Sequence, residues 1–137
     1  MKRVHPYAWL WEPLENDPAF LLRPMFGGRA AYVAGRLTLY FIAKSKIIWE
    51  AQSEVADWRG ICVCTGREHH ASLMNEFPEL APHPVLAKWL YLPESHNHFE
   101  PVAVRLVELV RRRDPRIGVL PQAKRGKKAA PASRRGR

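Results

Sequence analysis

Two runs of strand-forming residues dominate the hydrophobic pattern in the first third of the chain. Residues 29–34 and residues 36–42 are rich in Tyr, Val, Leu, Thr, Phe and Ile, which suit the pleated surface of a sheet. Only Ala34-Gly35 lies between them, so the pattern predicts a tight β-hairpin with Gly35 at positive φ. The Gly27-Gly28 pair ahead of the first run indicates a β-bulge or a close approach of two backbones.

Shorter apolar runs predict the remaining strands. Lys44-Ser45-Lys46 is polar and is expected to form a turn, after which Ile47–Glu50 is expected to form a third strand. Ile61–Cys64, bounded by glycines, and Leu86–Leu92, ended by a proline, are also expected to be strands. Residues 51–59 are compatible with a loop or with a short helix.

Two helical segments are expected before the hairpin. The apolar residues of Tyr7–Leu14 predict a short helix with a break near Pro13. Asp17 followed by a proline resembles an N-cap and a first helical position, which predicts a helical turn over Ala19–Leu22.

Two further helices are expected in the second half of the chain. Thr65 and Glu68 have the spacing of a capping box, so a helix is expected to run on to Phe77. Apolar residues at helical spacing predict a last helix from Phe99, which ends before Asp114-Pro115. The predicted order is α, three or four strands, α, β, α. We therefore expect an α+β fold: a mostly antiparallel sheet of four to five strands with helices packed on one face.

The charge distribution divides the chain into two parts. The net charge is +9, from 22 basic and 13 acidic residues. Removing the seven cations that follow residue 120 leaves +2 for residues 1–120. We expect a single domain over residues 1–117 and a disordered basic tail over residues 118–137, which has too little apolar surface to fold. The seven cations are Lys124, Arg125, Lys127, Lys128, Arg134, Arg135 and Arg137.

Composition excludes several classes of protein. No run reaches the ~18 consecutive apolar residues of a membrane span, and no apolar signal-peptide core follows the basic N-terminus. The chain is therefore expected in the cytoplasm, without membrane partners. Two cysteines do not make a disulfide scaffold. No phosphate-binding loop or dinucleotide fingerprint occurs, and no cofactor is expected.

Short motifs carry a family resemblance. Met25-Phe26-Gly27-Gly28 followed by Tyr32–Leu37 resembles the N-terminal domain family of the bacterial competence regulator TfoX. The segment Glu68–Phe77, the residues around Trp89 and the last helix are similar to the related YjbR family, so the resemblance spans roughly residues 5 to 113. It implies a small antiparallel α+β domain with a binding or regulatory role and no established catalysis. The second TfoX domain has no counterpart after the last helix.

Cysteine and histidine residues offer the candidate chemistry. Cys62 and Cys64 are followed by His69, which allows a zinc site or a cysteine nucleophile with a histidine base. The alternative is a half-buried strand with two small thiols, which the i, i+2 spacing favours. His96-Asn97-His98-Phe99-Glu100 allows a metal site, but Asn97 and Glu100 also have capping-box spacing, and capping is the expected role. His83, between two prolines, is expected to be exposed.

Aromatic residues and the basic tail offer candidate binding surfaces. Trp9 and Trp11 lie in a short N-terminal element and form either a partner surface or part of the core. The first functional hypothesis is a non-catalytic binding domain that contacts a protein partner through its sheet face or these indoles. The second is a nucleic-acid-associated protein whose tail binds phosphate backbones, although such a tail also serves as a solubilising extension. The third is a metalloprotein or enzyme. An edge strand could also pair two copies into a homodimer.

Overall fold

The sheet has six strands, and every neighbouring pair is antiparallel. The computed structural model describes residues 5–49, 54–84 and 86–120. The strand order is β1-β2-β3-β4-β6-β5. The strands are β1 (Phe20–Met25), β2 (Gly28–Val33), β3 (Arg36–Trp49), β4 (Glu54–Val63), β5 (Ala81–Pro82) and β6 (Leu90–Pro93). The helices are α1 (Ala8–Trp11), α2 (His70–Glu76) and α3 (Phe99–Arg111), with 3-10 turns η1 (Glu12–Leu14) and η2 (Arg67–His69).

The expected α+β class with an antiparallel sheet is confirmed, but the sheet is larger than predicted. It has six strands rather than four to five, and the order is α, four strands, α, two strands, α. The additional strands are β1 at one edge and β5 at the other. No helix in the described ranges has the length and apolar character that a membrane crossing requires.

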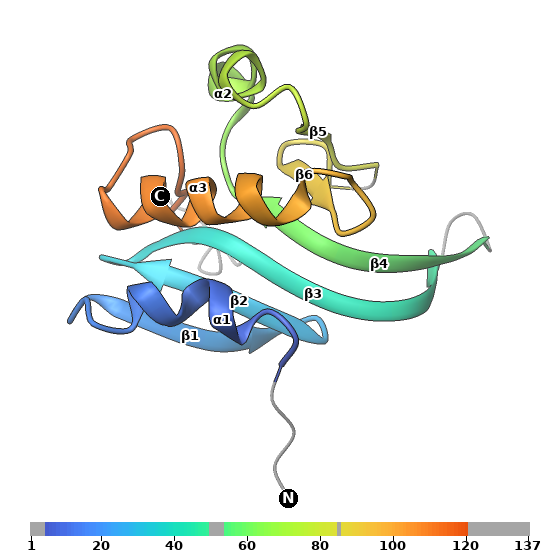
Figure 1. The fold of residues 1–137 in the computed structure, drawn as a ribbon, viewed down its shortest axis with the longest axis horizontal. Coiled ribbons are helices and arrows are strands. Elements are labelled where there is room, and N and C mark those ends of the chain that lie inside the picture. The colour runs from blue at the N-terminus through green and yellow to red at the C-terminus, as the bar shows by residue number, and fades with distance from the viewer. Residues whose placement is uncertain (1–4, 50–53, 85, 121–137) are drawn as a thin grey trace, which may run out of the picture.

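Helices α1 and α3 lie on the same face of the sheet, and α2 stands apart from them near β5 and β6 (Figure 1). α3 buries a stripe at helical spacing, which is the physical reason that it packs flat. The Trp11 ring of α1 lies 5.1 Å from the Phe41 ring of β3, and Leu73 of α2 joins the same core. The buried stripe of α3 is Phe99, Val102, Ala103, Leu106, Val107 and Val110.

Two tight hairpins connect the first three strands. Ala34 and Gly35 have φ of 53° and 79°, which confirms the predicted turn and the positive φ of Gly35. Phe26 and Gly27 form an equivalent turn between β1 and β2, with φ of 48° and 83°. Gly28 follows at the start of β2, where an added Cβ would lie 2.4 Å from the Phe41 carbonyl oxygen. Gly27 therefore permits the turn, and Gly28 permits the close approach of the β2 and β3 backbones.

Four strand predictions differ from the structure. The strand expected over Leu86–Leu92 starts later, because residues 86–89 form bends and turns and β6 covers only Leu90–Pro93. In the segment expected to form a helical turn at Ala19–Leu22, the residues from Phe20 on belong to β1, because their backbone pairs with β2. The Asp17 carboxylate does accept a hydrogen bond from the Ala19 amide at 2.9 Å, but it does so ahead of a strand. The expected turn at Lys44–Lys46 is a register irregularity within the continuous strand β3. Residues 54–59, expected to be a loop or helix, are strand β4.

The ends of the helices follow the prediction more closely than their beginnings. α2 ends before Pro78 and α3 ends at Arg111. Neither predicted capping box forms. The Thr65 hydroxyl donates to the Arg116 carbonyl oxygen at 2.6 Å. At α3 the N-cap is His98, without a side-chain cap, and its amide donates to His96 Nδ1 at 3.0 Å.

The last described residues return to the sheet. The amide and carbonyl of Val119 pair with those of Leu37, each at 2.9 Å. The Gly118 amide donates to the Cys64 carbonyl oxygen at 2.7 Å. These bonds continue two residues beyond the expected domain boundary at 117. The seven cations of the basic tail lie outside the described residues.

Candidate functional site

The face of the sheet opposite α1 and α3 carries a second apolar cluster, which we call the back face. Residues directly opposite each other in an antiparallel pair point to the same side of the sheet. The register therefore defines one row across all six strands, Arg23–Ala30–Tyr40–Cys62–Tyr91–Ala81. A second row, Leu21–Tyr32–Leu37, runs beside it.

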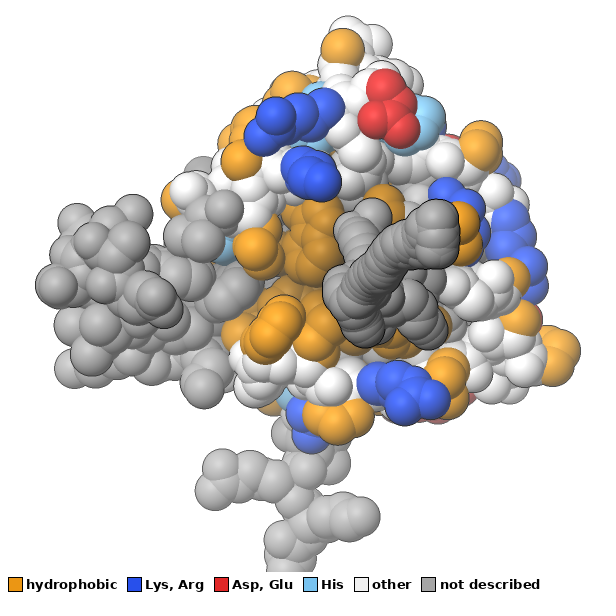
Figure 2. All heavy atoms as spheres, turned by 180° about the vertical axis from the view of Figure 1, so that it is seen from behind, with side chains coloured by type: hydrophobic (Ala, Val, Ile, Leu, Met, Phe, Trp, Pro, Cys, Tyr) orange, Lys and Arg blue, Asp and Glu red, His pale blue; other side chains and the backbone are white. Residues whose placement is uncertain are grey.

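The middle of the back face is apolar. Ala30, Tyr40, Ile42, Cys62 and Cys64 are fully buried. A ring of partly exposed side chains packs around them: Met25, Tyr32, Leu86, Trp89, Tyr91 and Val119. Seen from behind, apolar side chains gather across the middle of this face, with Lys and Arg groups at several points around the edge and an acidic group near the top (Figure 2). The sheet is therefore apolar on both sides, but the long helix covers only one of them (Figure 1).

Phe26 lies in the β1–β2 turn, directly after Met25, which packs against the back-face cluster. Its side chain is 76% exposed, although its backbone has a φ of 48° that a bulky residue rarely adopts. The Tyr40 hydroxyl stabilises the turn. It lies within hydrogen-bonding distance of two carbonyl oxygens, that of Met25 at 2.8 Å and that of Phe26 at 3.0 Å. Leu21 of the same edge strand is 47% exposed. The fold thus holds an aromatic ring in water at a backbone position that other residues suit better.

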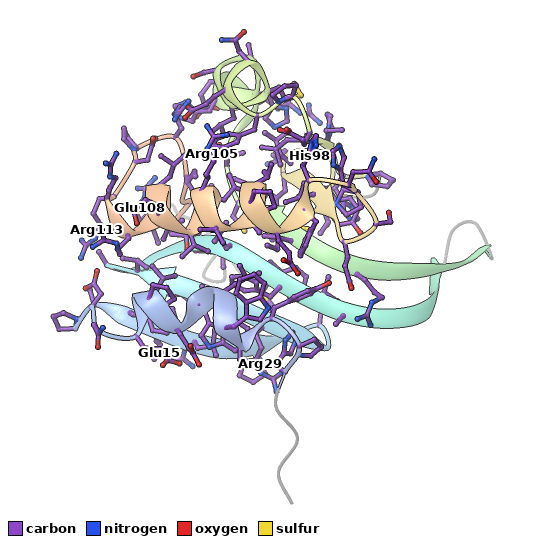
Figure 3. The ribbon with its side chains drawn as sticks, viewed as in Figure 1. Glu15, Arg29, His98, Arg105, Glu108 and Arg113 are labelled. Atoms are coloured by element: carbon purple, nitrogen blue, oxygen red, sulfur yellow. The ribbon has the colours of Figure 1, made fainter. Side chains whose placement is uncertain are left out.

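Charged side chains are distributed unevenly between the two sides of the molecule. Arg105, Glu108 and Arg113 lie along α3 and the turn after it (Figure 3), where Arg113 pairs with Asp17 at 2.9 Å. Strands β1, β2, β5 and β6 contain no acidic residue. Arg23 on the back face is exposed and makes no ion pair with any described residue. The back face is therefore apolar, and its edge at β1 and β2 is positive.

Cys62 and Cys64 point to the back face, as their i, i+2 spacing predicts. Burial raises the pKa of the Cys62 thiol to about 12 and that of the Cys64 thiol well above its usual range. Both thiols are therefore protonated at neutral pH, whereas nucleophilic attack and zinc binding need the thiolate.

The structure does not gather the cysteines and histidines into one site. His69 lies in η2, and its Nε2 is 3.7 Å from a Glu68 carboxylate oxygen. Among the side chains that the structure describes, which belong to residues 5–43, 59–84 and 86–120, no three His, Cys, Asp or Glu are placed to hold a metal ion. His96 Nδ1 is occupied by the His98 amide.

His83 is buried, at 2% exposure, so the expectation that it is exposed was wrong. Its Nδ1 accepts a hydrogen bond from the Leu86 amide at 3.0 Å, and its ring meets Tyr91 edge-on at 4.9 Å. Burial lowers the pKa of His83 to about 4, so the imidazole is neutral. His83 is therefore a buried residue that packs against Tyr91 of the back face.

The two N-terminal indoles have different environments. Trp11 is 5% exposed and packs in the core against Phe41, so it is not part of a partner surface. Trp9 is 45% exposed. The sequence analysis did not identify Phe26 as a surface residue. The signal available was its place before Gly27 in a two-residue turn, where side chains point outward.

Comparison of the chain with family models, with curated proteins and with solved structures finds no match in any of the three.

Proposed function

We propose that this chain is a non-catalytic binding domain that contacts a protein partner through its back face, as the resemblance to the TfoX N-terminal domain family implies. The observation that carries the proposal is Phe26, an exposed ring held at a strained turn on the edge of an apolar surface. Backbone strain of this kind costs about 1–3 kcal/mol and persists where it serves a purpose. Exposed aromatic anchors are typical of protein interfaces.

The chemistry of the partner follows from the charge of this face. Arg23 lies in the row that crosses the sheet, and no acidic residue occurs in β1 or β2. A complementary surface carries apolar side chains for the partly exposed ring around the buried centre, and carboxylates for Arg23 at the edge. The buried thiols and the neutral His83 argue against a catalytic role for the same face, because none of them is in a reactive form at neutral pH. The site of action that we propose is the cytoplasm.

A selection from a displayed library of random 12-residue peptides tests the proposal. Phe26→Asn removes the ring but keeps a residue that favours the turn, and Ala34→Asn is the matched control in the other hairpin. Selected peptides should be rich in acidic and apolar residues, and should bind the wild type and the Ala34→Asn variant but not the Phe26→Asn variant. Peptides that bind all three proteins equally would show that Phe26 is not the anchor.

A second candidate function is binding of nucleic acid, and one observation favours it. The described chain reaches the back face at Val119, immediately before the seven cations of the basic tail. Those cations would bind phosphate backbones with strong salt dependence. Titration of duplex DNA at low and moderate salt compares the wild type with a full-length variant in which all seven are glutamine. Equal binding by the two proteins would remove the tail from this function.

β1 is an edge strand of the sheet, so pairing between two copies also remains a proposal. A monomer in sedimentation experiments at micromolar concentration would contradict it.

A further inference from the structure

A groove of about 420 Å³ lies on the helix-covered side, where α1 approaches the start of α3. Trp9 and Tyr7 line it from the N-terminal segment, and Phe99 lines it from α3. Two carboxylates, Glu94 and Glu100, also line it. The groove is separate from the back face, which lies on the other side of the sheet.

Glu94 has one carboxylate oxygen in use and one available. Its Oε1 accepts hydrogen bonds from the Tyr7 hydroxyl at 2.6 Å and from Arg59 Nε at 2.7 Å. Its Oε2 has no hydrogen-bond partner among the described residues. The Tyr7 hydroxyl and then Arg59 hold the pKa of Glu94 below its usual range, so the group stays ionised. Glu94 is therefore a fixed, charged acceptor at the groove.

The groove is acidic in a basic protein. Its described lining contains two glutamates and neither lysine nor arginine, although the chain has a net charge of +9. Trp9 adds an indole that is 45% exposed. A guanidinium group suits this pair of features, because its planar fork pairs with a carboxylate while its face stacks on an aromatic ring. The compact ammonium group of lysine matches the indole less well.

We propose that this groove binds an arginine of the chain's own basic tail, supplied by the segment Arg134–Arg137. That segment carries three arginines within four residues, whereas Lys predominates closer to Leu120. Residues 121–133 connect it to Leu120 and span up to about 43 Å when extended. Val119, which precedes Leu120, packs against the back-face cluster, so the connection has to pass round the sheet to reach the groove. A domain of about 100 residues has a radius of gyration of about 13 Å, and the extended connection is about three times that length.

Attachment to the chain makes a weak contact sufficient. A connection of this number of residues gives an effective concentration on the order of 1 mM. An arginine site with a dissociation constant on the order of 1 mM is then about half occupied within one molecule. An exposed carboxylate and an indole can supply such an affinity without a deep pocket.

The indole N–H signal of Trp9 in a two-dimensional NMR spectrum reports on the groove, and Trp9→Phe assigns it. In the full chain, replacement of Arg134, Arg135 and Arg137 by glutamine should shift this signal. Addition of a synthetic peptide of residues 130–137 to that variant should move it back toward the wild-type position. The signal of buried Trp11 should stay in place in both steps.

Two variants at the carboxylates test the role of charge. Glu94→Gln should weaken peptide binding about tenfold, because glutamine keeps an acceptor for Tyr7 but loses the ion pair. Glu100 is exposed and makes no ion pair in the described part of the chain. Glu100→Gln therefore gives a second test of charge, which does not depend on the Tyr7 contact. Glu108→Gln is the control, because Glu108 lies toward the other end of α3 from His98 (Figure 3).

The Trp9 signal reports on the groove, and it does not depend on the peptide-binding experiment that tests the back face. A Trp9 signal that is identical in the wild type and the glutamine variant, and that the peptide does not move at several millimolar, would overturn the proposal. A shift that depends on protein concentration would also overturn it, and would assign the occupant to a second copy of the chain. The Phe26→Asn variant should behave as the wild type in this experiment.

Discussion

Phe26→Asn tests whether the exposed ring contributes to the stability of the fold or only to a binding surface. A residue with a β-carbon at left-handed φ costs about 1–2 kcal/mol, and Asn removes much of this cost, so the turn should gain about 1 kcal/mol. The ring is 76% exposed, so only about a quarter of its transfer free energy, roughly 0.5 kcal/mol, is lost with it. The net expectation is a variant about 0.5 kcal/mol more stable than the wild type.

Urea unfolding, followed by tryptophan fluorescence, measures this difference. Ala34→Asn at the equivalent position of the other hairpin gains the same turn preference and loses almost no burial, so it should be about 1 kcal/mol more stable. The two variants should therefore rank Ala34→Asn, Phe26→Asn, wild type. A loss of more than about 1 kcal/mol in the Phe26→Asn variant would refute the reasoning. It would mean that the ring contributes packing to the fold and is not held out for a partner.

Three further predictions concern the sheet and the groups beneath the back face. Gly28→Ala should lower the free energy of unfolding by about 3 kcal/mol, seen in urea unfolding, because its Cβ would meet the Phe41 carbonyl oxygen at 2.4 Å; near wild-type stability would contradict this. Cys62 and Cys64 should resist a thiol reagent at pH 8 and react fully in denaturant; rapid labelling of the native protein would contradict their burial. Because the pKa of His83 is lowered to about 4, the unfolded chain takes up the proton first, so stability should fall between pH 6.5 and 4 by up to about 3 kcal/mol. His83→Asn should reduce this dependence in urea unfolding at several pH values, and an unchanged pH profile would contradict the assignment.

The elements that the sequence predicted well are those fixed by local geometry. The hairpin at Ala34-Gly35 needs only a turn residue with positive φ between two strand-forming runs. α3 needs only apolar residues at helical spacing, and its end at Arg111 follows from the proline shortly after it. Both signals lie within a few residues of the structure that they determine.

The elements that the sequence missed depend on distant partners. β1 contains Pro24 and follows a helix-like start at Asp17, but pairing with β2 makes it a strand, and an edge strand tolerates proline. Thr65 has the sequence context of a cap, yet its hydroxyl bonds the Arg116 carbonyl, 51 residues away. Local propensity cannot anticipate either contact.

The candidate site was predicted in outline and not in its residues. A sheet face was one of the two surfaces expected to meet a partner, and the row from Arg23 to Ala81 gives that face its composition. His83 was expected to be exposed and is buried, and the exposure of Phe26 was not anticipated. Each error arose because the exposure of a turn or loop residue depends on strands that pack beside it from elsewhere in the chain.

The succession of neighbouring strands has a consequence for how the chain folds. β1 to β4 are joined in sequence order, so most of the sheet forms from contacts between residues close along the chain, and such topologies fold quickly. The bond between Arg36 and the Gly118 carbonyl joins residues that are 82 positions apart, and the Leu37–Val119 bridge lies beside it. We expect the β1–β4 meander to form early and this closing contact to form late. A ribosome still synthesising α3 would then already hold a nearly complete sheet, with both of its apolar faces accessible to chaperones.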